Sequence, residues 1–195
     1  MKKVFAIAAA LMLMGTTAFA QSFGAGYVQS TANSNTANGF YAGFGYSAEI
    51  MPGLSLNPGL YYEFLTSTTG ASLGSWASYS GKTTEHYVNI PLHLSFAYSF
   101  APTFKMFVYG GPTANVGIAS TTKGNIAGAI ETTTDNYKDS HYSRFDIMLG
   151  GGIGVELMSK IRLTVGYDMG MLDRNTRDNV TLKRNRLTAG AALVF

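Results

Sequence analysis

The stretch Phe40-Tyr-Ala-Gly-Phe-Gly-Tyr-Ser-Ala-Glu-Ile50 alternates between two kinds of residue. Every second position from Phe40 to Ile50 is apolar, whereas the positions between them carry small or polar side chains. A period of two places successive side chains on opposite faces of a β-strand. One face of this strand therefore meets an apolar environment and the other face meets a different one.

The same alternation recurs along the rest of the chain and predicts eight strands. The apolar faces cover residues 23–27, 40–50, 54–64, 88–98, 104–118, 145–157, 161–171 and 187–195. All but the first of these faces are long enough for a tilted strand to cross a bilayer, which takes about 9–11 residues. The pattern thus predicts an all-β protein with eight antiparallel strands.

The charged residues of these strands indicate what the second face meets. They fall between the apolar positions and never among them: Glu49, Glu63, Glu85, Lys105, Arg144, Asp146, Glu156, Arg162, Asp168, Arg184 and Arg186. We predict that these side chains face the lumen of a barrel. Because a buried charge needs a partner, we expect them to form a network of ion pairs there.

A soluble β-sandwich or lipocalin-like barrel has the same alternation, with its apolar face turned inward. Three features favour a membrane: charge-free apolar faces, an N-terminal export segment, and connections that alternate between short and long. The short ones lie at residues 51–53, 99–103 and 158–160, and the long ones at residues 31–38, 67–83, 120–140 and 173–179. The sequence therefore predicts a transmembrane β-barrel with periplasmic termini and four long outside loops.

The first 20 residues have the pattern of a secretory signal peptide. Lys2 and Lys3 precede an apolar run of 11 residues, and Ala18-Phe-Ala20 forms a small-x-small cleavage site. The apolar run is too short for a membrane-spanning helix, which needs about 20 residues. We expect residues 1–20 to be a cleaved signal peptide and residues 21–195 to be the outer-membrane β-barrel domain.

Composition narrows the function classes. Charged residues make up only 13% of the chain, whereas about 25% is usual for soluble domains. The formal net charge of +3 falls to +1 without Lys2 and Lys3, so nucleic-acid binding has no electrostatic support. With no cysteine, the chain has no disulfide and no thiolate metal site. We expect neither a cofactor nor a metal.

The C-terminal strand, residues 186–195, alternates and ends on the aromatic Phe195. This ending resembles the signal that the barrel-assembly machinery reads in bacterial outer-membrane barrels, with Gly190, Leu193 and Phe195 as its residues. Residues 21–195 resemble the small outer-membrane barrels of the OmpA/OmpX type, grouped with porin family proteins. The resemblance implies a monomer in the outer membrane of a Gram-negative bacterium, in contact with membrane lipids and lipopolysaccharide.

An eight-stranded barrel is just wide enough for its own side chains to fill. We therefore expect a packed polar lumen. The protein would then serve membrane integrity, or surface binding and adhesion of an extracellular ligand through its outside loops. The alternative is a narrow porin-like channel for small solutes, in which the lumen charges line a gated ion path.

A lipid A-modifying enzyme is the remaining alternative. One deacylase family carries a His-x-Ser pair on a strand with a supporting acid, and this chain has His93/Ser95 and His141/Ser143. The two-residue spacing puts both side chains on one face, as a serine nucleophile with a histidine base requires. The first pair has lumen parity, and no outward-facing acid follows the second pair. We expect no catalytic residues.

Overall fold

A computed structural model describes residues 19–33, 35–73, 77–126, 130–139, 142–174 and 182–195. The elements are β1 (Phe19–Ala32), β2 (Asn35–Met51), β3 (Leu54–Leu73), β4 (Ala77–Ala101), β5 (Phe104–Ile126), β6 (Ile130–Asp135), α2 (Asn136–Asp139), β7 (Phe145–Leu157), β8 (Ile161–Gly170) and β9 (Arg184–Val194). In these described ranges, no helix is long and apolar enough to cross a membrane.

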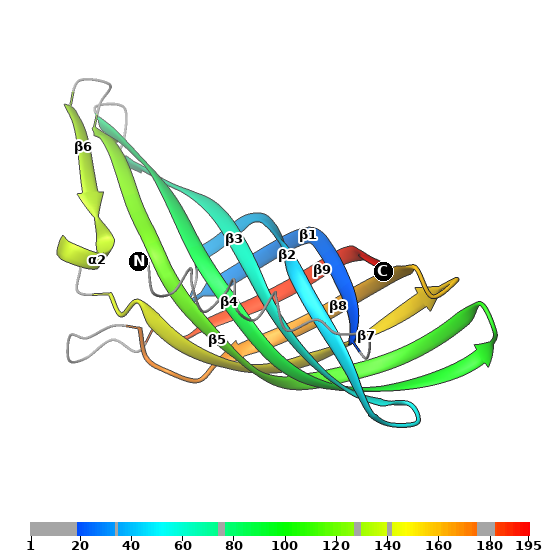
Figure 1. Cartoon of the computed structure of the whole chain (residues 1–195). Coiled ribbons are helices and arrows are strands. Elements are labelled where there is room, and N and C mark those ends of the chain that lie inside the picture. The colour runs from blue at the N-terminus through cyan, green and yellow to red at the C-terminus, as the bar shows by residue number, and fades with distance from the viewer. Residues whose placement is uncertain (1–18, 34, 74–76, 127–129, 140–141, 175–181) are drawn as a thin grey trace.

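Eight of the strands close into an antiparallel barrel (Figure 1). They pair in the order β1-β2-β3-β4-β5-β7-β8-β9, and β9 returns to pair with β1 from Ala32↔Arg184 to Ser22↔Val194. Closure gives the backbone N–H and C=O groups partners that lipid does not provide. The predicted eight-stranded antiparallel barrel is confirmed. The extra strand, β6, pairs with β5 beyond the barrel.

The two faces of the strands differ as the alternation predicts. Apolar side chains such as Phe40, Leu94 and Ile153 are at least half exposed on the outer surface. By contrast, Glu63 and Arg184 are fully buried in the interior. An apolar outside around a polar inside suits a barrel in lipid and excludes the soluble alternative, whose apolar face would be inside.

Three tight turns join β2 to β3, β4 to β5 and β7 to β8, at the positions that the sequence predicts. In the last of them, Met158 and Ser159 both have positive φ angles of 53° and 55°. Positive φ at both central residues is what a type I′ turn requires, and the Lys160 N–H closes the turn by donating to the Leu157 carbonyl at 3.0 Å. The three turns lie at the same end of the barrel as the first residues of β1 and the last residues of β9.

The prediction of long loops at residues 31–38, 67–83 and 120–140 is wrong over most of their length. β1 and β2 pair up to Ala32↔Asn35, β3 and β4 up to Leu73↔Ala77, and β5 and β6 up to Ile126↔Ile130. Beyond the membrane both faces of a strand meet water, so its sequence lacks the apolar alternation of period two. A strand rich in Ser, Thr and Gly then has the composition of a loop. Most of the fourth predicted loop, residues 173–179, lies outside the described residues.

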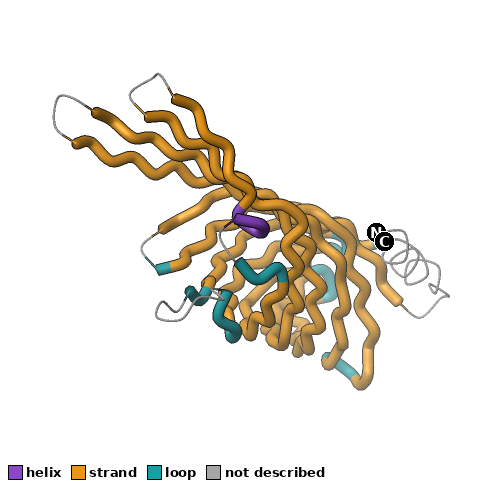
Figure 2. Tube along the Cα trace, turned by 90° about the vertical axis from the view of Figure 1, so that its left-hand side faces the viewer, coloured by secondary structure: helices purple, strands orange, loops and turns teal. Residues whose placement is uncertain are grey.

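The extended hairpins form one sheet that leaves the barrel (Figures 1 and 2). It consists of residues 67–73 of β3, 77–85 of β4, 120–126 of β5 and all of β6, paired in that order. We call these residues the projecting sheet. Figure 2 shows the two hairpins extending away from the barrel, with α2 near their base.

The C-terminal residues lie on two faces of β9. Leu193 and Phe195 are 55% and 72% exposed on the outside, and the Phe195 N–H donates to the Gln21 carbonyl at 2.8 Å. Gly190 lies on the lumen side, where a Cβ would collide with the Tyr41 phenol. Space for Tyr41 is thus a structural reason for glycine at position 190.

We propose that the mature barrel begins at Gln21. β1 starts before this residue, but Phe19 and Ala20 pair only with β2, while pairing with β9 starts at Ser22. Cleavage after Ala20 therefore leaves the closing seam of the barrel intact. N-terminal sequencing of the protein purified from outer membranes should give Gln-Ser-Phe-Gly. A retained Met1, or a start beyond Ser22, would contradict the proposal.

Candidate functional site

Glu63 lies at the centre of the lumen, where it accepts hydrogen bonds from two arginines of β9. Arg184 donates from Nη2 to Glu63 Oε1, and Arg186 donates from Nη1 to Glu63 Oε2 at 3.1 Å. Arg186 also donates to Asp168 Oδ2, at 2.9 Å from Nε and 2.6 Å from Nη2. These contacts join β3, β8 and β9 across the lumen.

Uncharged polar side chains complete this layer. Asn89 donates to Glu63 Oε2 at 3.0 Å, and Asn115 donates to Asn89 Oδ1. Arg184 donates from Nε to Ser30 Oγ at 2.6 Å. Buried polar groups need such partners, because an unsatisfied one costs about 1–3 kcal/mol. Ser30, Asn89 and Asn115 were not predicted as members of the network, although each lies at an inward-facing position of its strand.

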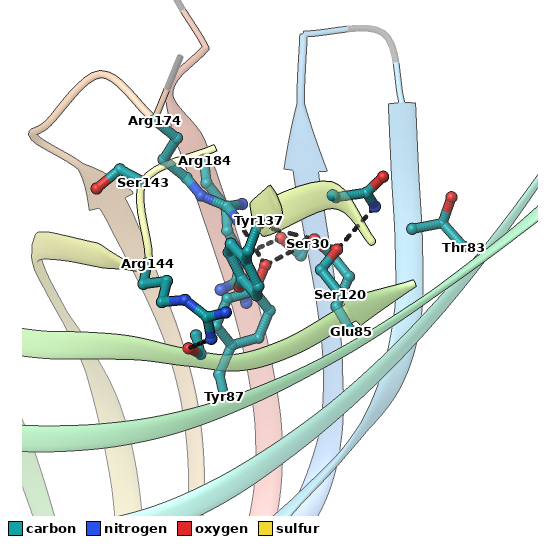
Figure 3. Close-up of polar contacts among 12 residues, drawn as sticks. Ser30, Thr83, Glu85, Tyr87, Ser120, Tyr137, Ser143, Arg144, Arg174 and Arg184 are labelled. Atoms are coloured by element: carbon teal, nitrogen blue, oxygen red, sulfur yellow. Dashed lines mark hydrogen bonds and ion pairs between the residues drawn. The ribbon is translucent and has the colours of Figure 1, made fainter. Parts of the chain in front are cut away.

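A second layer of polar side chains lies around Arg174 and Tyr87 (Figure 3). Arg174 donates to Tyr87 Oη at 2.7 Å and lies 3.7 Å from Glu85 Oε1, to which Tyr87 itself donates at 2.7 Å. Arg174 is only 4% exposed although it lies in a predicted loop. The ring of Tyr137 from α2 lies beside this group in Figure 3, and burial raises the pKa of its phenol, so it stays neutral.

A third group of charges lies toward the three tight turns. Glu156 accepts from Lys105 Nζ at 3.1 Å and from Arg162 Nη2 at 2.8 Å. Between this group and Glu63 lies a cavity of about 160 Å³, lined by Tyr41, Tyr61, Tyr109 and other residues. A cavity of this size holds several water molecules, since each occupies about 30 Å³ in the liquid. Its lining includes Asn89, Asp168 and Arg186 of the Glu63 layer.

The prediction that Glu49 and Arg144 belong to the lumen network is wrong. Glu49 is exposed and accepts the backbone N–H of Gly53 at 3.2 Å in the β2–β3 turn. Arg144 is exposed, donates to the carbonyl of Ile118 at 2.9 Å and packs 4.3 Å over the Tyr137 ring. Parity indicates the face of a strand but not the depth along it, and both residues lie at strand ends.

Asp146 lies inside the barrel but makes a different contact from the one predicted. It is 1% exposed and accepts the backbone N–H of Leu172 at 3.3 Å. Within the described part of the chain it forms no ion pair. It therefore fixes the segment that follows β8 rather than joining the arginines.

The His-x-Ser pairs show no catalytic arrangement where they are described. His93 Nε2 lies 3.1 Å from Thr113 Oγ1, whereas Ser95 Oγ accepts from Asn57 Nδ2 at 2.8 Å. His141 lies outside the described residues, and Ser143 Oγ donates to the carbonyl of Phe145 at 3.0 Å. Among the side chains that the structure describes, no group of three His, Asp or Glu residues is placed to hold a metal ion.

Residues 12–173 match the family model described as "Outer membrane protein beta-barrel domain". The chain belongs to this family. The match covers most of the barrel, and it places the protein in the outer membrane, where the apolar outer surface described above meets lipid. The predicted family, location and lipid environment are thereby confirmed. No curated protein sequence matches the chain.

Solved structures of other outer-membrane barrels resemble this family member in fold. The outer membrane enzyme PagL has 10% identity and a TM-score of 0.50, with 87% of this chain and 97% of that chain covered. Neisserial surface protein A has 14% identity and a TM-score of 0.49, covering 93% and 99%. Ail of Yersinia pestis has 13% identity and a TM-score of 0.45, covering 92% and 100%. At such low identities the likeness concerns the fold alone.

Replacement of Glu63 tests the central layer of this outer-membrane barrel. Glu63→Gln leaves Arg184 buried without a carboxylate partner, whereas Arg186 keeps Asp168. Removing one partner of a buried ion pair costs about 3–5 kcal/mol, so we expect the free energy of unfolding to fall by about that amount. Urea unfolding of the barrel in lipid vesicles measures it.

Glu49→Gln is the matched control for this experiment. It removes the same charge from an exposed side chain that accepts one backbone hydrogen bond. We expect it to change the free energy of unfolding by less than about 0.5 kcal/mol. Similar losses in the two variants would contradict the role given to Glu63.

Proposed function

We propose that the protein is a non-enzymatic, non-conducting barrel that binds a partner at the cell surface through its projecting sheet. The observation that carries the proposal is the continuation of β3, β4 and β5 far beyond the barrel as one hydrogen-bonded sheet (Figure 2). A barrel that only spans the membrane needs strands of about 9–11 residues. β3, β4 and β5 have 20, 25 and 23 residues.

In the described part of the chain, both outer strands of this sheet, β3 and β6, pair on one side only, and the β3 edge is the longer one. β2 pairs with β3 only as far as Asn38↔Thr66. Among the described residues, no strand pairs with residues 67–73 of β3 on the side away from β4. At about 3.3 Å per residue this edge is about 23 Å long. Its backbone groups are available to a strand from another protein.

The composition of this edge supports binding rather than protection. Proteins usually guard exposed edges with charges, prolines or very short strands. Residues 67–73, Ser-Thr-Thr-Gly-Ala-Ser-Leu, contain neither a charge nor a proline. An extended peptide that adds to such an edge gains main-chain hydrogen bonds along its length. The class of partner that fits is therefore an extended segment of another protein.

A narrow porin is the second candidate function, and the lumen cavity is the observation in its favour. The cavity reaches from Arg162 to the Glu63 layer. Two layers of paired side chains, around Glu63 and around Arg174, stand between it and the outside. These layers support a closed barrel.

We also propose that the barrel-assembly machinery recognises Phe195 and that the protein is a monomer.

Excision of the free edge tests the binding proposal. Residues 70–80 are replaced by Asn-Gly, which joins the paired Thr69 and Gly81 through a two-residue hairpin turn. A library of random 12-residue peptides is first selected on the intact barrel in lipid nanodiscs. We expect the selected peptides to lose at least about tenfold in affinity for the excised barrel, because they lose most of their main-chain partners.

The control shortens the other hairpin of the projecting sheet. Residues 124–132 are replaced by Asn-Gly between the paired Lys123 and Thr133, which leaves the free edge of β3 in place. Peptides that bind the edge should bind this variant as tightly as the intact barrel. The proposal fails if no peptide is selected above empty nanodiscs, or if both excisions weaken binding equally.

A further inference from the structure

Four exposed side chains form a row across the projecting sheet. Thr68 of β3 pairs with Lys82 of β4, Lys82 pairs with Lys123 of β5, and Lys123 pairs with Thr133 of β6. All four are exposed. Side chains directly opposite each other on one face of a sheet have Cβ atoms about 4.5–5.5 Å apart. The row therefore presents two ammonium groups side by side with a hydroxyl at each end.

The row lies on the outer face of the sheet, away from the axis of the barrel. The neighbouring residues Thr83 and Thr122 face the other way, where their hydroxyls lie 2.9 Å apart. Thr122 donates to Asn136 of α2 at 3.2 Å, so α2 covers that inner face (Figure 3). Lys82 and Lys123 consequently continue the face that meets lipid lower down on β4 and β5.

Among the side chains that the structure describes, Lys82 and Lys123 form no ion pair. Neither ammonium has a carboxylate within 4 Å among the described side chains. Like charges directly opposite each other on a sheet destabilise it. An anion bound between the two lysines removes this repulsion. The position thus favours a ligand with a negative charge that both lysines reach.

The height of the row indicates where that anion comes from. Four residues below Lys82, His86 packs against Phe64 with ring centroids 5.3 Å apart and contacts the Tyr62 hydroxyl at 2.5 Å. Such aromatic residues mark the edge of the hydrocarbon. Four residues along a strand tilted by 35–45° rise about 10 Å above that edge. The row therefore lies at the level of the polar headgroups beside the barrel.

We propose that this row binds a phosphate of the phosphorylated saccharide headgroup of lipopolysaccharide in the outer leaflet. Lys82 and Lys123 supply the charge, and Thr68 and Thr133 donate hydrogen bonds to the same headgroup. The site lies on the outer face of the projecting sheet and not on its free edge. It therefore holds whether or not the edge binds a peptide.

The test compares a double variant that removes two positive charges from the row with a control that removes two positive charges elsewhere. Lys82→Gln/Lys123→Gln removes two charges from the row. Lys138→Gln/Lys160→Gln removes two exposed lysines elsewhere, one in α2 beside Asp135 and one in the β7–β8 turn. Each folded barrel is titrated in detergent with purified short-chain lipopolysaccharide, and the bound fraction is measured by native mass spectrometry. Heat-modifiable migration in gels verifies that each variant is folded.

We expect the row variant to bind lipopolysaccharide about tenfold more weakly than the wild type, and the control to match the wild type. Lipopolysaccharide stripped of its phosphates should bind the wild type as weakly as intact lipopolysaccharide binds the row variant. The proposal is overturned if the two double variants lose affinity equally or if removal of the phosphates has no effect. It is also overturned if phosphatidylglycerol competes as well as lipopolysaccharide, since the site would then lack preference for a saccharide headgroup.

Discussion

The carboxylate of Glu63 accepts hydrogen bonds from both Arg184 and Arg186, and the interior of the barrel is arranged around this contact. A charge in a low-dielectric interior costs several kcal/mol unless a partner of opposite sign and further hydrogen bonds satisfy it. Here every member of the layer has such a partner. β3 and β9 do not pair through their backbones, so Glu63 adds a direct side-chain contact between them across the lumen.

Paired side chains cross the lumen around Glu63 and around Arg174, and a cavity of about 160 Å³ lies beside the Glu63 layer. We propose that the protein therefore acts at the cell surface rather than through its lumen. The two long hairpins form a sheet that extends beyond the barrel (Figure 1). Its edge and its outer face have different chemistry: residues 67–73 of β3 offer unpaired backbone groups, whereas Lys82 and Lys123 offer positive charge near the membrane. We propose that this one sheet contacts a partner protein through its β3 edge and the surrounding lipid through its outer face.

The fold was largely predictable from the sequence because both faces of a membrane strand are constrained. Lipid requires an apolar outer side chain at every second position, and a narrow lumen leaves the charges no other place. This constraint ends at the membrane surface. The hairpins of β3–β4 and β5–β6 were therefore mistaken for loops, since their strands meet water on both sides.

Parity predicted which charges face inward, but it gave no depth and no partner. Glu63, Arg184 and Arg186 meet because of the tilt of the strands, which relates residues more than 120 positions apart. Glu49 and Arg144 have the same parity but lie at strand ends, where they face solvent and backbone. Arg174 was not predicted because it follows β8 in a segment without alternation.

The closed lumen is the central claim, and electrical conductance tests it most directly. Residues 21–195 are refolded into a planar bilayer and recorded at single-channel resolution. Protease protection in vesicles of the same lipid verifies that the barrel is inserted. We predict no conductance steps from the inserted barrel, because the layers around Glu63 and Arg174 block ions. A stable and reproducible channel would contradict the closed lumen and make passage of small solutes the function to pursue.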